Sequence, residues 1–137
     1  MLYEKIYKDE KIFIEASMDF SYHMNFRFTG RGSSKSVVVF IDMLTKMHEK
    51  IPVGETADSV LDCLEYGRTP LLSQIRIGKW LLQNQQKTGR ISIVGAKPLE
   101  VKIAKAIMRM TSINRIGFFA TNQAAHDWLG WKPATAD

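Results

Sequence analysis

Two apolar patterns alternate along the chain from residue 25 onward, and this alternation constrains the fold more than any other feature. Short segments typical of strands occur at 25–29, 60–64, 90–94 and 115–120. Longer segments with helical periodicity separate them at 37–51, 71–86 and 99–111, and a last short helix is expected between Thr121 and Gly130. Strands that alternate with helices are typical of a parallel sheet covered by helices.

The first 16 residues follow a different pattern. Segments 3–8 and 12–16 predict two short strands around a tight turn at Asp9, Glu10 and Lys11. They should add an antiparallel N-terminal edge to a mostly parallel sheet. With 137 residues, the sequence predicts one α/β domain over 1–132, covered by about four helices, and a short tail over 133–137.

The net charge of +5 is divided unevenly along the chain. Residues 1–65 hold 8 Lys/Arg and 11 Asp/Glu, whereas residues 66–137 hold 11 and 3. This division suggests an anionic partner for the second half. A single cysteine excludes a disulfide framework and a cysteine-based metal cluster. Without a long apolar run or a secretory signal, the expected location is the cytoplasm, with no integral membrane segment.

Three predicted strand-to-helix turns combine glycine with a basic residue. They contribute the candidate ligand-binding residues Arg31, Gly32, Lys35, Gly67, Arg68, Thr69, Gly95 and Lys97. Such turns meet at one edge of a parallel sheet, and the N–H groups of the following helices favour anions. One interpretation is therefore an anion-binding site. The other is that the glycines only allow the chain to turn and that the basic residues are ordinary exposed loop residues. Thr69 is also expected to cap the next helix, with Pro70 in its first position.

Basic residues also recur on two predicted helices: Arg76, Lys79, Lys87, Lys102, Lys105 and Arg109. They form either a solvated surface or a surface for an anionic partner. No aromatic stacking set or recognition motif accompanies them, so no nucleic-acid partner is expected.

A third candidate is an apolar pocket. Bulky or adaptable side chains could line it or simply fill the core: Met18, Met24, Met43, Met47, Met108, Met110, Phe20, Phe26 and Phe28. Catalytic and metal-binding patterns are weak, because His23, His48 and His126 lack metal-ligand spacing and Cys63 is expected to be an inert buried thiol. No metal and no cofactor is predicted.

Four packing motifs carry a family resemblance. They read Arg-Ile-Ser-Ile-Val-Gly at 90–95, Ile-Ala-Lys-Ala at 103–106, Ile-Gly-Phe-Phe at 116–119 and Ala-Ala-His-Asp-Trp-Leu at 124–129. Together with the element order, they resemble the STAS domain of anti-sigma-factor antagonists, in particular its SpoIIAA-like bacterial members. In that family a Ser or Thr at the start of the second helix is phosphorylated. Here the corresponding loop is Tyr-Gly-Arg-Thr-Pro at 66–70, so the resemblance implies Thr69 as the nearest phosphoacceptor.

The resemblance implies a regulatory or ligand-binding module and not an enzyme. Its expected partners are a regulatory protein or a small molecule such as an anionic ligand, and a homodimer is a further expectation. Two alternatives remain open from the residues alone. One is a carrier of a small nonpolar or amphipathic molecule, and the other is an enzyme that acts on a phosphorylated metabolite.

Overall fold

Six strands form one sheet, and their spatial order is the same as their order in the chain. The computed structural model describes residues 1–111 and 113–131, so the predicted tail at 133–137 lies outside the described residues. The strands are β1 (Tyr3–Lys8), β2 (Ile12–Met18), β3 (His23–Gly30), β4 (Ala57–Tyr66), β5 (Thr88–Val94) and β6 (Ile116–Phe119). The helices are α1 (Ser34–Glu49), α2 (Leu71–Gln83), the short 3₁₀ helix η1 (Gln85–Lys87), α3 (Pro98–Thr111) and α4 (Asn122–Leu129).

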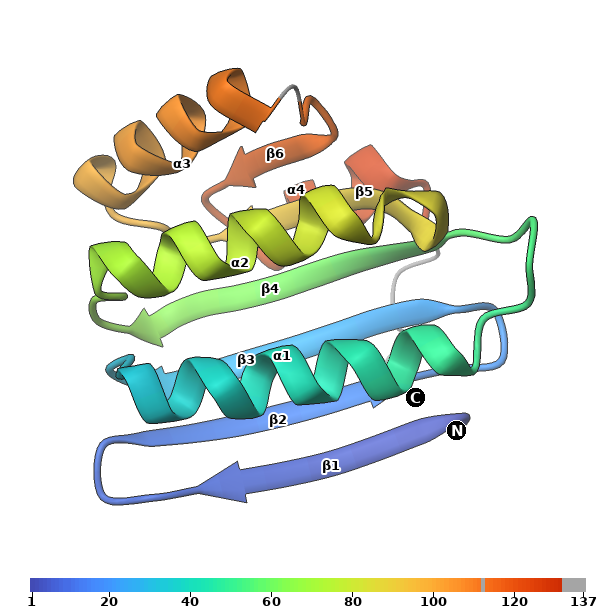
Figure 1. Cartoon of the computed structure of the whole chain (residues 1–137), viewed down its shortest axis with the longest axis horizontal. Coiled ribbons are helices and arrows are strands. Elements are labelled where there is room, and N and C mark those ends of the chain that lie inside the picture. The colour runs from blue at the N-terminus through green and yellow to red at the C-terminus, as the bar shows by residue number, and fades with distance from the viewer. Residues whose placement is uncertain (112, 132–137) are drawn as a thin grey trace.

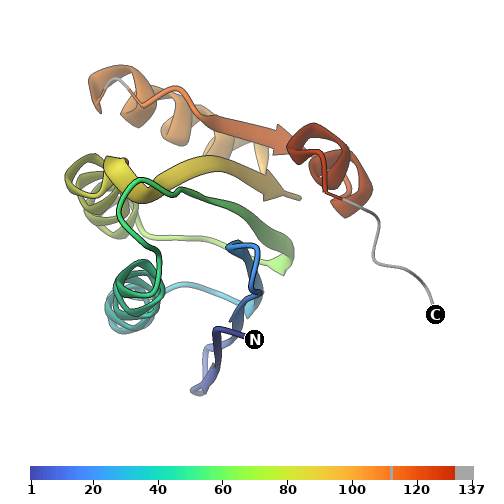
Figure 2. The same ribbon diagram turned by 90° about the vertical axis from the view of Figure 1, so that its right-hand side faces the viewer.

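The sheet is antiparallel from β1 to β3 and parallel from β3 to β6. The predicted mostly parallel α/β sheet with an antiparallel N-terminal edge is therefore confirmed. Right-handed crossovers between successive parallel strands place α1, α2 and α3 on one face, where they lie side by side (Figure 1). Helix α4 packs against β4, β5 and β6 from the opposite face, as the turned view in Figure 2 shows.

Helix α1 begins with a run of valines that would favour a strand if it stood alone. A reciprocal cap decides in favour of the helix: Ser36 N donates to Ser33 Oγ at 3.1 Å, and Ser33 N donates to Ser36 Oγ at 2.9 Å. The helix then buries Val37, Phe40 and Leu44 against the sheet. The predicted helix is confirmed, and of the two adjacent serines that could cap it, Ser33 and Ser34, the first does so.

Helix α2 is shorter than its apolar periodicity predicts. It ends at Gln83 and not at residue 86, because Asn84 leaves the helical conformation at φ −124°. The Asn84 side chain then donates to Trp80 O at 2.8 Å, while its own carbonyl accepts from the Thr88 hydroxyl at 2.7 Å. The sequence predicts that Thr88 and Gly89 end the helix, but in the structure they are the first residues of β5.

Apolar side chains pack on both faces of the sheet. The larger cluster lies beneath the helices and includes Ile14, Phe26, Met43 and Trp80. A smaller cluster joins β4 and β5 to α4 on the other face. This packing holds the carboxyl ends of β3, β4 and β5 beside the first turns of the three crossover helices.

Candidate functional site

The first two strand-to-helix turns are joined backbone to backbone. Gly67 N donates to Gly30 O at 2.6 Å, and Gly32 N donates to Arg68 O at 3.0 Å. A Cβ at Gly32 would collide with the Tyr66 hydroxyl, so a larger residue would require the Tyr66 side chain to move. The two predicted turns therefore form one continuous ledge at the edge of the sheet.

The third turn is attached to this ledge through an acidic side chain. Gly95 begins the turn at φ +79°, and a Cβ there would approach the Leu64 backbone to 2.9 Å. In the first turn of α3, Glu100 Oε1 accepts from Thr69 N at 3.2 Å, and its Oε2 accepts from Gln74 Nε2 at 3.1 Å. The carboxylate thus supplies a negative group to the N-terminus of α2.

Thr69 does not cap α2, so that prediction was wrong. Helix α2 has Pro70 at the N-cap position and no side-chain cap bond. The Thr69 Oγ1 instead shares a 2.6 Å hydrogen bond with the Tyr66 hydroxyl. The hydroxyl of the predicted phosphoacceptor is therefore half-buried and already paired.

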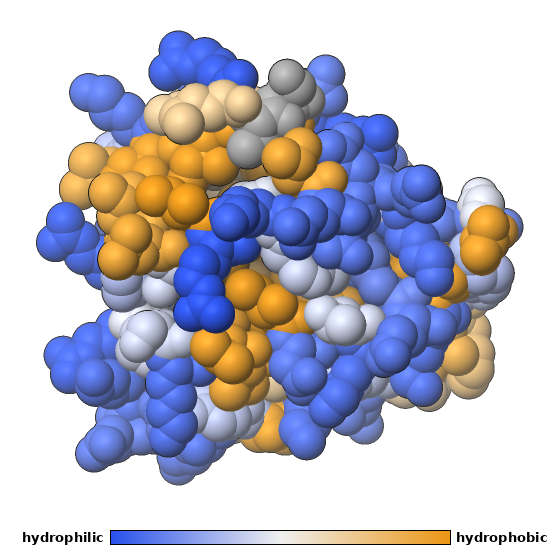
Figure 3. Space-filling view, in the orientation of Figure 1, coloured by the Kyte–Doolittle hydropathy of each residue, from blue (hydrophilic) through white to orange (hydrophobic). Residues whose placement is uncertain are grey.

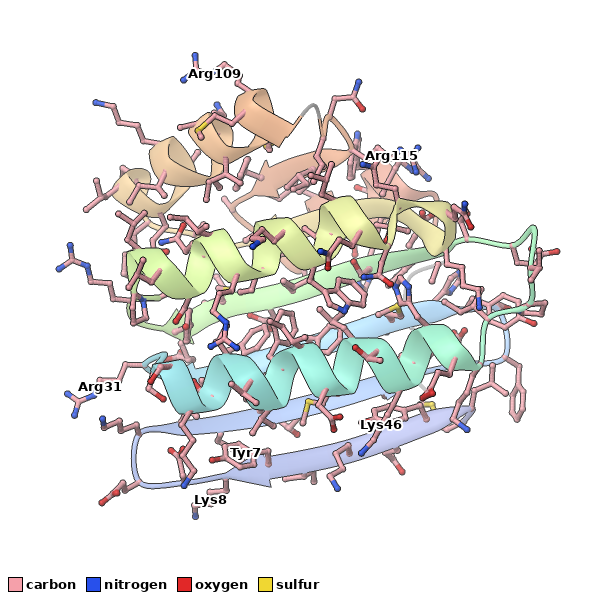
Figure 4. The ribbon with its side chains drawn as sticks, in the orientation of Figure 1. Tyr7, Lys8, Arg31, Lys46, Arg109 and Arg115 are labelled. Carbon is pink, nitrogen blue, oxygen red and sulfur yellow. The ribbon has the colours of Figure 1, made fainter. Side chains whose placement is uncertain are left out.

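The candidate ligand-binding residues separate into two groups. Gly32, Gly67, Thr69, Gly95 and Lys97 line the same cavity, so the structure brings them together. Arg31 and Arg68 are exposed on the loops around it, and Lys35 is exposed in the first turn of α1. In Figure 4 the Arg31 side chain extends outward, away from the sheet. Basic groups therefore surround the ledge without converging on one point.

The cavity has a volume of about 190 Å³ and lies between the crossover helices and the sheet. Its inner wall is mostly apolar and includes Leu61, Ile93 and Ile107, and its lining reaches exposed Gly67 and Lys97 at the ledge. An engineered apolar cavity of roughly 150 Å³ is large enough to bind benzene. The space is therefore sufficient for a short apolar group, and exposed residues of the strand-to-helix turns form part of its lining.

The methionines and phenylalanines proposed for an apolar pocket mostly lie elsewhere. Of that set, Phe28 and Met108 line the cavity. Five others are core residues with at most 2% exposure: Met18, Met24, Met43, Met47 and Phe26. Phe20 and Met110 are exposed. The pocket was predicted from bulky residues, but the cavity exists where small ones, such as Ser59 and Ala104, leave space.

The titratable groups beside the cavity are not arranged for nucleophilic chemistry. Burial, helped by the negative charges of Asp62 and Glu100 and opposed by Lys97, raises the pKa of Cys63 to about 12. Burial likewise raises the pKa of Tyr66 to about 12. Both groups are protonated at neutral pH, and a thiol is a much weaker nucleophile than a thiolate.

The histidines are arranged differently from their spacing in the sequence. The rings of His23 and His126 both contact Trp131, at centroid distances of 4.3 and 5.4 Å, whereas His48 packs against Trp80. Within residues 1–111 and 113–131, no three His, Cys, Asp or Glu side chains form a group that could hold a metal.

The predicted basic helix surface is largely exposed. Arg76 and Lys79 on α2 and Lys102, Lys105 and Arg109 on α3 reach solvent. Lys87 differs, because its Nζ donates to His48 O at 3.0 Å and it is half-buried.

Comparison with known proteins shows which solved structures share this architecture. Neither a known family model nor a curated protein matches the sequence. Among solved structures, the chain is similar to an uncharacterized protein of the DUF3478 family from Shewanella loihica PV-4, itself described as having a SpoIIAA-like fold. The TM-score is 0.64 at 18% identity, over 90% of this chain and 97% of that one.

The fold is SpoIIAA-like. The anti-sigma factor antagonist SpoIIAA in its unphosphorylated form supports the same conclusion, with a TM-score of 0.58 and 12% identity over 85% of this chain and 96% of that one. At these identities the likeness to the SpoIIAA-like structures concerns the fold. In the described part of the chain, no helix is long and apolar enough to span a bilayer.

Sequence reasoning missed Glu100 and Tyr66, although one signal pointed to the first. Glu100 is the only acidic residue between Glu65 and Asp127 in an otherwise basic stretch. A lone carboxylate in the first turn of a helix suggests an electrostatic role. The pairing of Tyr66 with Thr69 had no comparable signal.

Proposed function

We propose that the chain is a non-enzymatic, cytoplasmic binding module that holds a small amphipathic ligand. The apolar part of the ligand would occupy the cavity, and an anionic head would lie at the ledge beside Lys97 and Arg68. The single observation that carries this proposal is a mostly apolar cavity of about 190 Å³ whose lining includes all three strand-to-helix turns. Ligands of open α/β sheets bind at this edge.

The charges at the ledge favour an anionic head over a cationic one. Lys97 lines the opening, and Arg31, Lys35 and Arg68 are exposed around it. Glu100, the one carboxylate among the described residues that line the cavity, is already hydrogen-bonded to Thr69 N and Gln74. An anion would therefore be attracted by the rim without requiring Glu100 to move.

A regulatory role fits the same proposal. SpoIIAA, which shares the fold, is an anti-sigma factor antagonist, and such a protein acts by binding a partner. A ligand at the ledge would contact the first turns of α1, α2 and α3 together. Ligand binding would therefore change the surface that a regulatory protein, or a second copy in a homodimer, could recognise.

The test uses hexyl phosphate as a probe, with inorganic phosphate and hexanol as its two separated halves. We expect hexyl phosphate to raise the melting temperature and to appear as a one-to-one complex in native mass spectrometry. Inorganic phosphate alone should do neither. The variant Ala104→Leu places three carbons into the cavity and should weaken binding by about 10-fold or more, which corresponds to roughly 1.4 kcal/mol.

Ala106→Leu is the matched control, because residue 106 is on the same helix but outside the cavity lining. It should bind the probe like the unmodified protein. Equal loss in both leucine variants would contradict binding in the cavity, and so would the absence of any hexyl phosphate complex.

A further inference from the structure

Helices α2 and α3 share an apolar strip on their outer surface. It consists of six side chains that are between 41% and 84% exposed: Leu71, Leu72, Ile75, Leu82, Leu99 and Met110. In the space-filling view hydrophobic residues gather over α3 and the adjoining end of α2 (Figure 3). An exposed contiguous patch of this kind marks an interaction surface in a folded protein.

Helical periodicity places most of the strip along the line where the two helices meet. The hydrogen bond between Gln74 and Glu100 identifies the facing sides of α2 and α3. At 100° per residue, Leu71, Ile75 and Leu82 follow Gln74 toward solvent on α2. Leu99 and Met110 occupy the corresponding side of α3. The strip therefore runs along both helices and does not consist of scattered residues.

Basic side chains flank the strip on both sides. Arg76 and Lys79 lie on the far side of the exposed α2 surface, and three basic residues lie on the far side of α3, namely Lys102, Lys105 and Arg109. Figure 4 shows the Arg109 side chain at the outer margin of α3, pointing away from the sheet. Helix α2 contains no acidic residue, and Glu100, the one acid of α3, is bonded toward α2. This surface combines apolar and positive groups without an exposed negative charge.

The positive charge of this surface favours some binding partners over others. A second copy related by two-fold symmetry would bring five positive charges against five others, which is unfavourable. Protein interfaces are enriched in aromatic residues and depleted in lysine, but this surface has no aromatic side chain among its strip or its flanks. Lysine and arginine beside protruding aliphatic side chains are typical of surfaces that lie on anionic lipid.

We propose that the α2–α3 surface docks on an anionic lipid bilayer. The strip enters the boundary between headgroups and acyl chains, and the five flanking cations contact lipid phosphates on either side. The helices lie flat on the bilayer, in agreement with the lack of a membrane-spanning helix in the described residues. Docking by this surface does not depend on whether the cavity binds a ligand.

The experiment is flotation of the full chain with vesicles of two compositions. One is phosphatidylcholine alone, and the other includes about 30% phosphatidylglycerol to give an anionic surface. We expect binding to the anionic vesicles only, and weakening as the salt concentration rises from about 0.1 to about 0.5 M. A variant with Lys102→Gln, Lys105→Gln and Arg109→Gln should lose about 100-fold in affinity, since each basic residue contributes about 1 kcal/mol near such a surface.

Matched controls use residues on other elements. Lys5→Gln, Lys8→Gln and Lys11→Gln remove the same total charge from the exposed β1–β2 hairpin and should change affinity by less than about 3-fold. For the apolar contribution, Leu72→Ser with Met110→Ser should weaken binding, whereas Ile6→Ser with Val53→Ser should not. All four of these apolar side chains are more than 60% exposed, so the variants should fold.

Four outcomes would overturn the proposal. They are failure to float with anionic vesicles at low salt, equal binding to both vesicle types, equal losses in the α3 and hairpin variants, and a concentration-dependent dimer abolished by the two serine changes on the strip. Binding to polyglutamate without binding to vesicles would also overturn it, in favour of an acidic protein partner.

Discussion

A negative group at position 69 would face the Glu100 carboxylate, and this conflict can be measured. Thr69→Glu removes the hydroxyl that is bonded to Tyr66 at 2.6 Å. It also places a carboxylate beside a residue whose Oε1 is 3.2 Å from Thr69 N. A phosphate on Thr69 would meet the same neighbour with more charge.

The expected cost has two parts. Two carboxylates about 5 Å apart repel by roughly 3 kcal/mol at an effective dielectric constant of about 20, and partial exposure reduces this to about 1.5 kcal/mol. Loss of the hydroxyl bond adds about 1 kcal/mol. Thr69→Glu should therefore lower the free energy of unfolding by about 2.5 kcal/mol, and Thr69→Val by about 1 kcal/mol.

A double-mutant cycle in urea separates these parts. In a Glu100→Gln background, Thr69→Glu should cost only about 1 kcal/mol, which leaves a coupling of about 1.5 kcal/mol between the two positions. At a pH low enough to protonate both carboxyls, the coupling should disappear. A coupling below about 0.5 kcal/mol at neutral pH would refute the reasoning, because the two groups would then not interact as the geometry requires.

Three further predictions concern the supporting structure. Burial and Lys87 lower the pKa of His48 to about 4, whereas the unfolded chain takes up this proton near pH 6.5. The free energy of unfolding should therefore fall as the pH drops from about 6.5 to about 4. In urea titrations, His48→Gln should flatten this pH dependence. Trp80→Phe removes the 3.1 Å hydrogen bond from the indole N–H to Thr45 Oγ1 and should lower the free energy of unfolding, measured by denaturation, by about 1 to 2 kcal/mol. Thr45→Val should have a smaller effect. A Trp80→Phe variant as stable as the unmodified protein would contradict this prediction. Arg90 donates to two carbonyls at the end of α4, at 2.7 and 2.9 Å, so Arg90→Lys should speed amide exchange in α4 by about 10-fold, with amides of α1 unchanged as the internal reference.

Periodicity was sufficient to predict the elements because each buries one face. The β-branched run before Ile41 was assigned to a helix because Leu44 and Met47 continue the helical spacing, and α1 confirms it. The ends of elements were harder to predict. Strand β4 extends to Ala57 and Tyr66 because it pairs with most of β3, and the sequence alone does not reveal the partner strand.

The candidate site was predictable in its position but not in its internal bonds. Glycine turns at helix starts indicated the edge of the sheet whose turn residues line the cavity. They did not indicate that the Tyr66 and Thr69 hydroxyls would form a hydrogen bond, or that Glu100, 31 residues from Thr69, would accept a hydrogen bond from Thr69 N. The cavity was harder still, because it results from small residues on three elements that meet only in the folded chain.

The identity of spatial and chain order in the sheet bears on how the protein folds. Each strand pairs with the one synthesised just before it, and each pairing closes a loop that contains at most one crossover helix and its connecting turns. Such sequence-local pairing lowers the entropy of loop closure and favours rapid folding. On the ribosome, the sheet can grow one strand at a time from its antiparallel edge. The C-terminal strand β6 is then the last strand to pair, and it completes the sheet by covering the open edge of β5.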